Sequence, residues 1–405
     1  MGFSAGWPRR GDVATKHRFE TCDGGGSIDR ADMFGGAMGD DRKTGALHDD
    51  YLRLIARREQ GARPSDAADT GYQIAGKRVW VAGHRGMVGS ALVRRLGTEH
   101  CMVLTTDRAT LDLTRQADVE AWMAVHKPQA VILAAARVGG ILANQSQPAD
   151  FLYDNLAIET HVIHAAWQTG VEKLLFLGSS CIYPKMAPQP ITEDALLSGA
   201  LEATNQWYAV AKITGLMMAR AYRLQHGCDF ISGMPTNLYG PGDNFDLETS
   251  HVLPALIRKA HEAKLRGEAT LTIWGTGTPR REFLHVDDCA DALVHVLKHY
   301  SEDEHINIGS GEDLPIYDLA QLVAEVVGFS GEIVRDTTKP DGTPRKLMSG
   351  AKLEALGWRP RIALRDGIAD AYRAFLSGHE DLVRMRSQAA PPKRETSDAP
   401  AVRRI

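Results

Sequence analysis

Short apolar runs alternate with helical patterns along the central part of this chain, and this alternation limits the possible folds more than any other feature. Helical patterns follow the first apolar run and fill most of residues 149–169. Strands that alternate with helices pair in parallel through right-handed crossovers, and the helices cover both faces of the sheet. The sequence therefore predicts an α/β fold with a doubly wound parallel (Rossmann) sheet. The runs with strand character are 77–82, 103–104, 130–133, 173–177 and 230–234.

The pattern changes from about residue 239. Helical patterns at 252–266 and 286–300 are separated by a short strand at 271–274, and the loops carry Pro, Gly and charge. We therefore expect a Rossmann domain mainly over 73–238 and a smaller, mixed α/β substrate-binding domain mainly over 239–380, with interleaved elements.

The two ends of the chain differ from its centre. Residues 1–72 are rich in Gly, Arg and Asp, and residues 387–405 carry adjacent Ala and Pro with scattered charges. Such segments offer little apolar surface to bury. Both are predicted to be disordered extensions.

Composition excludes several classes of function. The formal net charge of -4 gives no basic field for nucleic acid, and hydrophobic residues make up 43% of the chain, enough for a full core. The longest apolar run, near 131–142, is interrupted by Arg137 and glycines, so no membrane span is expected. The 5 cysteines form no CxxC pair. We expect no disulfide framework, no metal site and no signal peptide, and a reducing, cytoplasmic environment.

A glycine-rich turn follows the first predicted strand and opens a helix. Gly83, Gly86 and Gly89 have GxxGxxG spacing. The first glycine permits the tight turn, the second lets a pyrophosphate approach the backbone, and the third lets the helix pack on the strand. The N–H groups at the start of the helix then face the phosphates. We interpret this turn as a dinucleotide site, the alternative being a connection that binds nothing.

The choice of nicotinamide cofactor depends on the end of the second strand. A carboxylate there favours NAD, whereas an arginine accommodates the 2′-phosphate of NADP. This chain has both, Asp107 and Arg108, and Arg85 in the glycine turn is a further cation. We favour NADP(H), although either arginine could be a solvated surface residue.

A serine, a tyrosine and a lysine form the candidate catalytic set. Ser179 follows the fourth predicted strand, and Tyr208 and Lys212 share one helix face at i and i+4. An ammonium beside a phenol favours the phenolate, so such a tyrosine can exchange a proton near neutral pH. Ser179 can hydrogen-bond the same substrate oxygen at the carboxyl edge of the sheet. An amphipathic helix without catalytic function is the alternative.

With these motifs in place, the chain resembles the extended short-chain dehydrogenase/reductase family. The resemblance covers about residues 76–378 and is closest to the members that epimerise and reduce GDP-4-keto-6-deoxy-D-mannose. The strings that carry it are 83–90, 134–141, 174–185, 234–241, 281–288 and 339–346. Of these, Ser-Ser-Cys-Ile-Tyr-Pro and Lys-Pro-Asp-Gly-Thr-Pro-Arg-Lys are specific to that group.

The resemblance implies C3/C5 epimerisation and NADPH-dependent C4 reduction at one site, in a homodimer. It implies that Cys181 and His251 carry the epimerisation; because inversion needs a base on one face and an acid on the other, we expect Cys181 as base and His251 as acid. From the residues alone, Cys181 could be a small buried residue and His251 a helix-start residue bonded to backbone. Besides Arg108, which comes from the residues after the second strand, the expected cofactor contacts are Gly83, His84, Arg85, Gly86, Met87, Val88, Gly89, Leu177, Gly178, Ser179, Ser180, Lys212, Pro235, Thr236, Asn237, Leu238 and His251.

The resemblance further implies that Lys259, Trp274, Arg281 and Asp341 bind the GDP-sugar. Trp274 could instead be a core residue, and Arg281 part of a structural salt-bridge cluster. Two other functions stay open: a related nucleotide-sugar 4-epimerase or 4,6-dehydratase, and a Rossmann sensor that binds nucleotide without turnover. Cys181 with His251 argues against the first, and the retained Tyr208 and Lys212 argue against the second.

Overall fold

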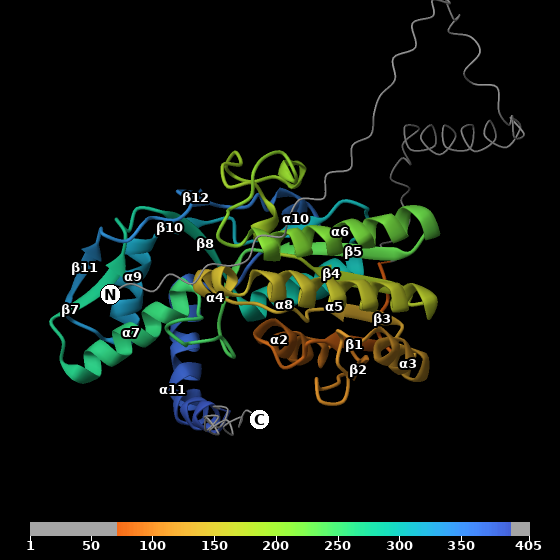
Figure 1. Cartoon of the computed structure of the whole chain (residues 1–405), viewed down its shortest axis with the longest axis horizontal. Coiled ribbons are helices and arrows are strands. Elements are labelled where there is room, and N and C mark those ends of the chain that lie inside the picture. The colour runs from red at the N-terminus through yellow and green to blue at the C-terminus, as the bar shows by residue number, and fades with distance from the viewer. Residues whose placement is uncertain (1–70, 390–405) are drawn as a thin grey trace, which may run out of the picture. The chain divides into compact units, whose positions relative to one another are not determined.

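A parallel sheet forms the centre of the structure, a computed structural model that describes residues 71–389 (Figure 1). Its strand order is β2-β1-β3-β4-β5-β9, with every pair parallel, as expected for a doubly wound fold. The predicted fold class is confirmed. The strands are β1 (Arg78–Ala82), β2 (Met102–Leu104), β3 (Ala130–Leu133), β4 (Lys173–Leu177), β5 (Asp229–Pro235) and β9 (Ile306–Ile308).

Helices cover both faces of this sheet. Successive strand residues point to opposite faces, and both faces carry apolar side chains that the helices bury. In β1, Val79 and Val81 join the core under α2 and α8, whereas Trp80 joins the core under α3, α5 and α6. The helices are α2 (Met87–Leu96), α3 (Gln116–His126), α4 (Ile141–Ser146), α5 (Pro148–Gln168), α6 (Gln206–His226) and α8 (Val286–His299), with short turns η1 (Ser180–Ile182) and η2 (Glu193–Ala195).

A third core lies among the later elements. It includes Phe283, Leu319 and Phe375. β8 is central to a small mixed sheet: β10 pairs with it antiparallel, whereas β6 and β12 pair with it in parallel. β7 and β11 form a separate parallel pair. The elements are β6 (Asn237–Tyr239), α7 (Val252–Arg266), β7 (Thr270–Trp274), β8 (Arg280–His285), β10 (Asp313–Pro315), α9 (Ile316–Val327), β11 (Glu332–Asp336), β12 (Arg345–Lys346), α10 (Ala351–Ala355) and α11 (Leu364–Ala389).

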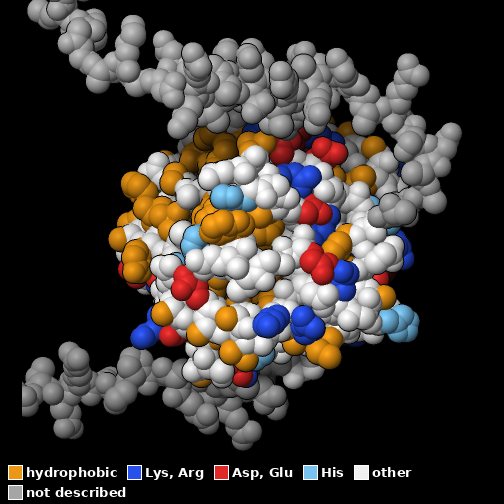
Figure 2. All heavy atoms as spheres, turned by 90° about the vertical axis from the view of Figure 1, so that its right-hand side faces the viewer, with side chains coloured by type: hydrophobic (Ala, Val, Ile, Leu, Met, Phe, Trp, Pro, Cys, Tyr) orange, Lys and Arg blue, Asp and Glu red, His pale blue; other side chains and the backbone are white. Residues whose placement is uncertain are grey.

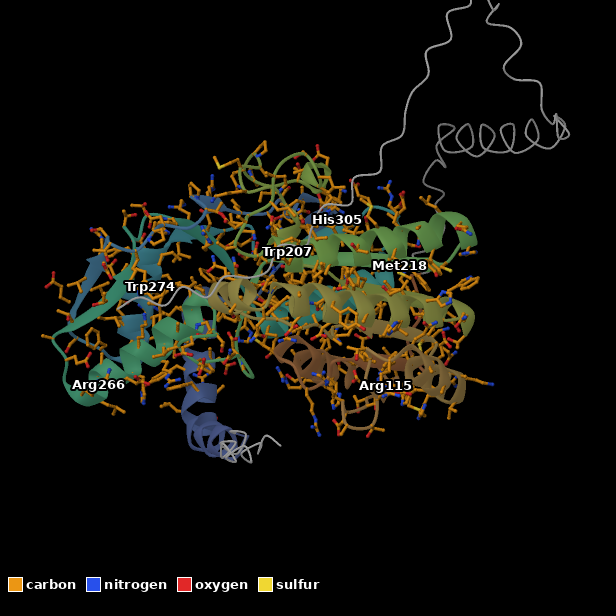
Figure 3. The ribbon with its side chains drawn as sticks, viewed as in Figure 1. Arg115, Trp207, Met218, Arg266, Trp274 and His305 are labelled. Atoms are coloured by element: carbon orange, nitrogen blue, oxygen red, sulfur yellow. The ribbon has the colours of Figure 1, made fainter. Side chains whose placement is uncertain are left out.

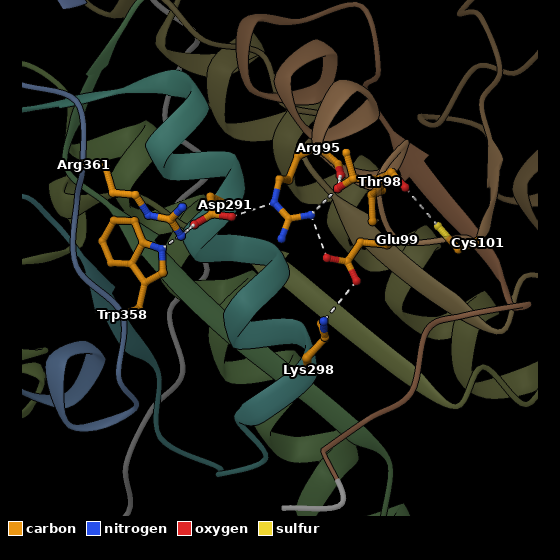
Figure 4. Close-up of polar contacts among 9 residues, drawn as sticks. Arg95, Thr98, Glu99, Cys101, Asp291, Lys298, Trp358 and Arg361 are labelled. Carbon is orange, nitrogen blue, oxygen red and sulfur yellow. Dashed lines mark hydrogen bonds and ion pairs between the residues drawn. The ribbon is translucent and has the colours of Figure 1, made fainter.

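Two late elements return to the first sheet. α8 packs beside α2, and β9 adds the outermost strand next to β5. A polar network fixes α2 to α8 (Figure 4): Arg95 Nε lies 2.6 Å from Asp291 Oδ1, and Lys298 Nζ lies 3.0 Å from Glu99 Oε2. Trp358 Nε1 donates to Asp291 Oδ2 at 2.9 Å. These charges compensate one another, so we assign this network a structural role.

The ends of α5 and α6 form one face of the molecule. Figure 2 shows hydrophobic side chains and histidines gathered there. Trp167, near the end of α5, stacks on His226 at the end of α6, with ring centroids 4.5 Å apart. Within 71–389, no helix is long and apolar enough to cross a membrane.

The predicted extensions fall largely outside the described residues. The prediction placed Tyr72 in the first extension, but its N–H donates to the carbonyl of Lys298 at 2.7 Å, so Tyr72 is part of the fold. At the other end, α11 continues to Ala389 and overlaps the start of the second predicted extension. The functional division into a cofactor-binding and a substrate-binding domain stays a prediction.

Candidate active site

The turn between β1 and α2 has no room for side chains at two of its glycines. Gly83 has a φ of +92°, and a Cβ there would lie 2.7 Å from backbone atoms of Ala135. A Cβ on Gly89 would lie 2.1 Å from the carbonyl oxygen of Gly83. The end of β1, the start of α2 and the segment after β3 therefore pack as closely as glycine permits.

The start of α2 presents free N–H groups. Its N-cap, Gly86, has no side chain to accept them, and no acidic residue lies in the first turn. A helix N-terminus of this kind attracts anions through its N–H groups and its dipole. The closely packed glycine turn and this uncapped helix fit the diphosphate of a nicotinamide dinucleotide. Met87 and Val88 follow, packed partly against the core.

At the end of β2, the carboxylate expected for ribose is already paired. Arg85 Nε lies 2.7 Å from Asp107 Oδ1, and Arg85 Nη2 donates to Oδ2 at 2.8 Å. His84 Nε2 lies 3.4 Å from the same carboxylate. Arg108 is exposed beside this cluster. Arg85 and Arg108 are the two arginines near this strand end that could meet a 2′-phosphate.

The carboxyl ends of β4 and β5 bring the next predicted cofactor contacts together. Leu177 ends β4, and a Cβ on Gly178 would lie 2.2 Å from the sulfur of Met234 in β5. Pro235 ends β5, Thr236 follows, and Asn237 with Leu238 begins β6, where Asn237 Nδ2 donates to the carbonyl of Glu282 at 2.8 Å. These residues share the sheet edge with the glycine turn.

The structure brings the predicted catalytic set together. Ser179 caps η1, where its hydroxyl accepts the N–H of Cys181 at 3.3 Å, and it is also hydrogen-bonded to Tyr208. Burial raises the pKa of Tyr208, the Cys181 and Glu159 charges raise it further, and the Ser179 hydrogen bond opposes them. Lys212 Nζ lies 5.9 Å from the centre of the Tyr208 ring. The predicted shift toward the phenolate is therefore wrong: Lys212 is paired with Glu159, and Tyr208 stays protonated, as the acid of a reduction must be.

Sequence reasoning missed Glu159, the ion-pair partner of Lys212. Glu159 Oε1 lies 2.9 Å from Lys212 Nζ, and both side chains are 2% exposed. Gly215 makes room for this pair, because a Cβ there would lie 2.7 Å from Glu159 Oε2. The signal was present in the sequence: Glu159 follows Phe151 and Asn155 at helical spacing on the buried face of α5.

Cys181 lies in the same cluster, held by η1. Asn205 Nδ2 donates to its sulfur at 3.1 Å, and Lys346 Nζ does so at 3.8 Å. Tyr183, two residues after Cys181, is anchored as well, because its hydroxyl is hydrogen-bonded to His305 Nε2 at 2.8 Å. Figure 3 labels His305, together with Trp207, which precedes Tyr208 at the start of α6. The thiol is thus positioned rather than merely buried.

His251 caps α7 from a segment that packs on the first sheet. The N–H of Gly140, after β3, donates to the carbonyl of Thr249 at 3.0 Å. The His251 side chain keeps contact with solvent. The surrounding protein nevertheless removes much of the water around the ring, and this burial lowers the pKa of His251; the Lys346 ammonium lowers it further. Lys346 therefore lies within electrostatic reach of both predicted epimerisation residues.

The predicted substrate contacts form a second group around β7 and β8. Trp274, labelled in Figure 3, is 58% exposed, so the core alternative for it is wrong. Lys259 Nζ lies 5.6 Å from its ring centre. Asp341 accepts the N–H of Thr276 at 2.9 Å, which fixes the 339–344 loop. Arg281 Nη1 donates to the carbonyls of Arg280 and Thr343 at 2.8 and 2.6 Å.

A Rossmann sheet with a glycine turn after β1 and a Ser-Tyr-Lys set on β4 and α6 defines a nicotinamide-dependent enzyme of the short-chain dehydrogenase/reductase type. The model of the NAD dependent epimerase/dehydratase family matches residues 79–309. The chain belongs to this family.

Relatives of known function match most of the chain. A GDP-L-fucose synthase of Sinorhizobium fredii is 61% identical over 76% of this chain and 99% of its own length. GDP-L-fucose synthase 1 of Arabidopsis thaliana is 62% identical over 74% of this chain and 93% of its own. A GDP-L-fucose synthetase structure from Naegleria fowleri with NADP bound is 28% identical, with a TM-score of 0.71, over 77% of this chain and 98% of its own.

Proposed function

We propose that this enzyme converts GDP-4-keto-6-deoxy-D-mannose to GDP-L-fucose by C3/C5 epimerisation and NADPH-dependent C4 reduction. The two relatives support this activity along nearly their whole length, and the NADP-bound structure supports the cofactor. The observation that carries the proposal is the position of Cys181. A plain reductase needs the serine, tyrosine and lysine, whereas here a thiol is held beside the same tyrosine.

Epimerisation uses the acidity that the C4 ketone gives to C3 and C5. Cys181 removes the proton from one face, and the electron pair moves to the C4 oxygen. Tyr208 and Ser179 donate hydrogen bonds to that oxygen and stabilise the enolate. His251 returns a proton to the opposite face, which re-forms the ketone with inverted configuration.

Reduction uses the same hydrogen bonds for a different purpose. Bound NADPH supplies the hydride that C4 receives. Tyr208 then gives its proton to the new alkoxide, which its raised pKa permits because the phenol is protonated beforehand. Lys212 lies next to Tyr208 and is oriented by Glu159, and Arg108 with Arg85 would hold the 2′-phosphate.

The group around β7 and β8 would bind the GDP portion. Trp274 offers an exposed ring for stacking on guanine, while Lys259 and Arg281 supply cations for the diphosphate. Asp341 positions the loop that follows β11. We also propose that the enzyme works as a homodimer in the cytoplasm.

The decisive assay follows NADPH absorbance after addition of GDP-4-keto-6-deoxy-D-mannose. Wild-type enzyme should oxidise NADPH, and Cys181→Ser should lose epimerisation while it still binds NADPH. A folded wild-type enzyme that leaves NADPH unchanged would refute the proposed function. A Cys181→Ser enzyme that epimerises at the wild-type rate would refute the role of the thiol.

A further inference from the structure

Two hydrogen-bond donors reach the sulfur of Cys181 from different elements. Asn205 Nδ2 donates from the start of α6 at 3.1 Å, and Lys346 Nζ donates from β12 at 3.8 Å. The neighbouring Tyr208 is a neutral phenol. A cation and neutral donors around a cysteine stabilise its thiolate form relative to the thiol.

Lys346 is the cation whose charge is available to the sulfur. The other cations that line this pocket have carboxylate partners: Lys185 Nζ lies 2.9 Å from Glu202 Oε2, and Arg345 pairs with Asp313. For Lys346, no ion pair with a carboxylate is found within the described residues 71–389, and its contact is with Cys181.

The backbone holds Lys346 in place from both sides. The N–H of Arg280 in β8 donates to the carbonyl of Pro344 at 2.8 Å, just before β12. After β12, the N–H of Leu347 donates to Gln189 Oε1 at 2.8 Å, and the N–H of Met348 donates to Glu282 Oε2 at 3.1 Å. In β12, Arg345 and Lys346 point to opposite sides, one toward Asp313 and the other toward Cys181.

We propose that Lys346 is a positioning residue for the epimerisation: its ammonium lies close enough to the Cys181 sulfur to stabilise the negative charge that this base carries. This inference rests on the proposed function. In the balanced step, the C–H bond at C3 or C5 breaks and an S–H bond forms on Cys181. The electron pair goes to the C4 oxygen, and the N–H bond of the His251 imidazolium breaks as the opposite face of the carbon is protonated. Solvent then restores both side chains.

The Lys346 ammonium acts on both Cys181 and His251, so its removal should change the ionisation of both side chains. Removal of the positive charge should make the Cys181 sulfur harder to deprotonate and should raise the pKa of His251. A side chain that only fills space would change neither. Lys346→Met removes the charge and keeps the length, Lys346→Arg keeps the charge, and Lys298→Met in the distant network on α8 is the matched control.

The experiment measures alkylation of Cys181 by iodoacetamide against pH, with peptide mass spectrometry to identify the site. For Lys346→Met, the pH midpoint of alkylation should rise by about one unit, so that thiolate at neutral pH falls about tenfold. Lys346→Arg should restore most of the wild-type profile, and Lys298→Met should reproduce it. If Lys346→Met does not fold, Lys346→Gln serves for the same comparison.

A second measurement follows solvent deuterium entering C3 and C5 of GDP-4-keto-6-deoxy-D-mannose. Exchange should fall about tenfold in Lys346→Met at neutral pH and recover at higher pH. Superimposable alkylation profiles of wild type and Lys346→Met would overturn the proposal, even if activity falls. Failure of the proposed function looks different: wild-type enzyme would neither exchange deuterium nor oxidise NADPH, whereas the alkylation shift would still be measurable.

Discussion

The buried ion pair between Glu159 and Lys212 allows a stability prediction that can be worked from the structure. At 2.9 Å, two unit charges attract each other by about 6 kcal/mol if the effective dielectric constant is about 20. Removal of water from both side chains, each 2% exposed, offsets much of this attraction. The net contribution of the ion pair to the free energy of unfolding is therefore small. The loss of stability when one partner alone is removed is large, because the other charge stays buried.

Glu159→Gln keeps the volume of the side chain and removes its charge. We expect the free energy of unfolding to fall by about 3–5 kcal/mol, because Lys212 is left buried without its counterion. The assay is urea denaturation followed by circular dichroism. The double variant Glu159→Gln/Lys212→Met should recover much of the loss, because it leaves neither charge buried alone.

The matched control is an exposed pair. Arg365 and Glu325 have side chains 58% and 60% exposed, so Glu325→Gln should change stability by less than about 1 kcal/mol. The reasoning is refuted if Glu159→Gln costs no more than Glu325→Gln, or if the double variant is less stable than Glu159→Gln alone.

The remaining predictions concern the proton donor, the glycine turn and a buried carboxyl group. Tyr208→Phe should lower kcat for NADPH oxidation by about 10²- to 10⁴-fold, because the alkoxide loses its proton donor, while the exposed Tyr153→Phe keeps the wild-type rate; a loss below about tenfold would argue against this role. Gly89→Ala should weaken NADPH binding and cost about 1–3 kcal/mol of stability, since its Cβ would lie 2.1 Å from a backbone oxygen, whereas Gly350→Ala meets nothing within 4 Å; equal fluorescence titrations would contradict it. Burial raises the pKa of Asp243 to about 7, above its unfolded value. The contribution of the protonated carboxyl group to the stability of the fold is therefore fully present below about pH 4 and is lost as pH rises through about 7. Urea midpoints should therefore fall less with pH in Asp243→Asn than in wild type, and parallel curves would disprove the assignment.

The central sheet could be predicted because its strands are short, continuous apolar runs. β3 and β4 have the predicted bounds, and so does α7, where apolar residues recur at helical spacing. β8 and β12 were missed because Arg280, Glu282 and Arg345 give them no apolar alternation. These strands form through tertiary pairing with neighbours distant in the sequence, which local patterns do not reveal.

The candidate site divides in the same way. Ser179, Tyr208 and Lys212 could be found because their spacing in one helix and at one strand end is a local feature. Glu159 and Lys346 reach the site from α5 and β12, and only the folded arrangement shows that one meets Lys212 and the other Cys181. A charged residue on a buried helix face and an unused lysine in a subfamily-specific string were the signals available.

The most direct test of the proposed function is the structure of the product. Purified enzyme would receive GDP-4-keto-6-deoxy-D-mannose and NADPH in D₂O, and the nucleotide sugar would be identified by NMR. The proposed activity predicts GDP-L-fucose with solvent deuterium at both C3 and C5, because each epimerisation passes through an enolate. A product reduced at C4 that keeps the D-manno arrangement at C3 and C5, without deuterium, would contradict it.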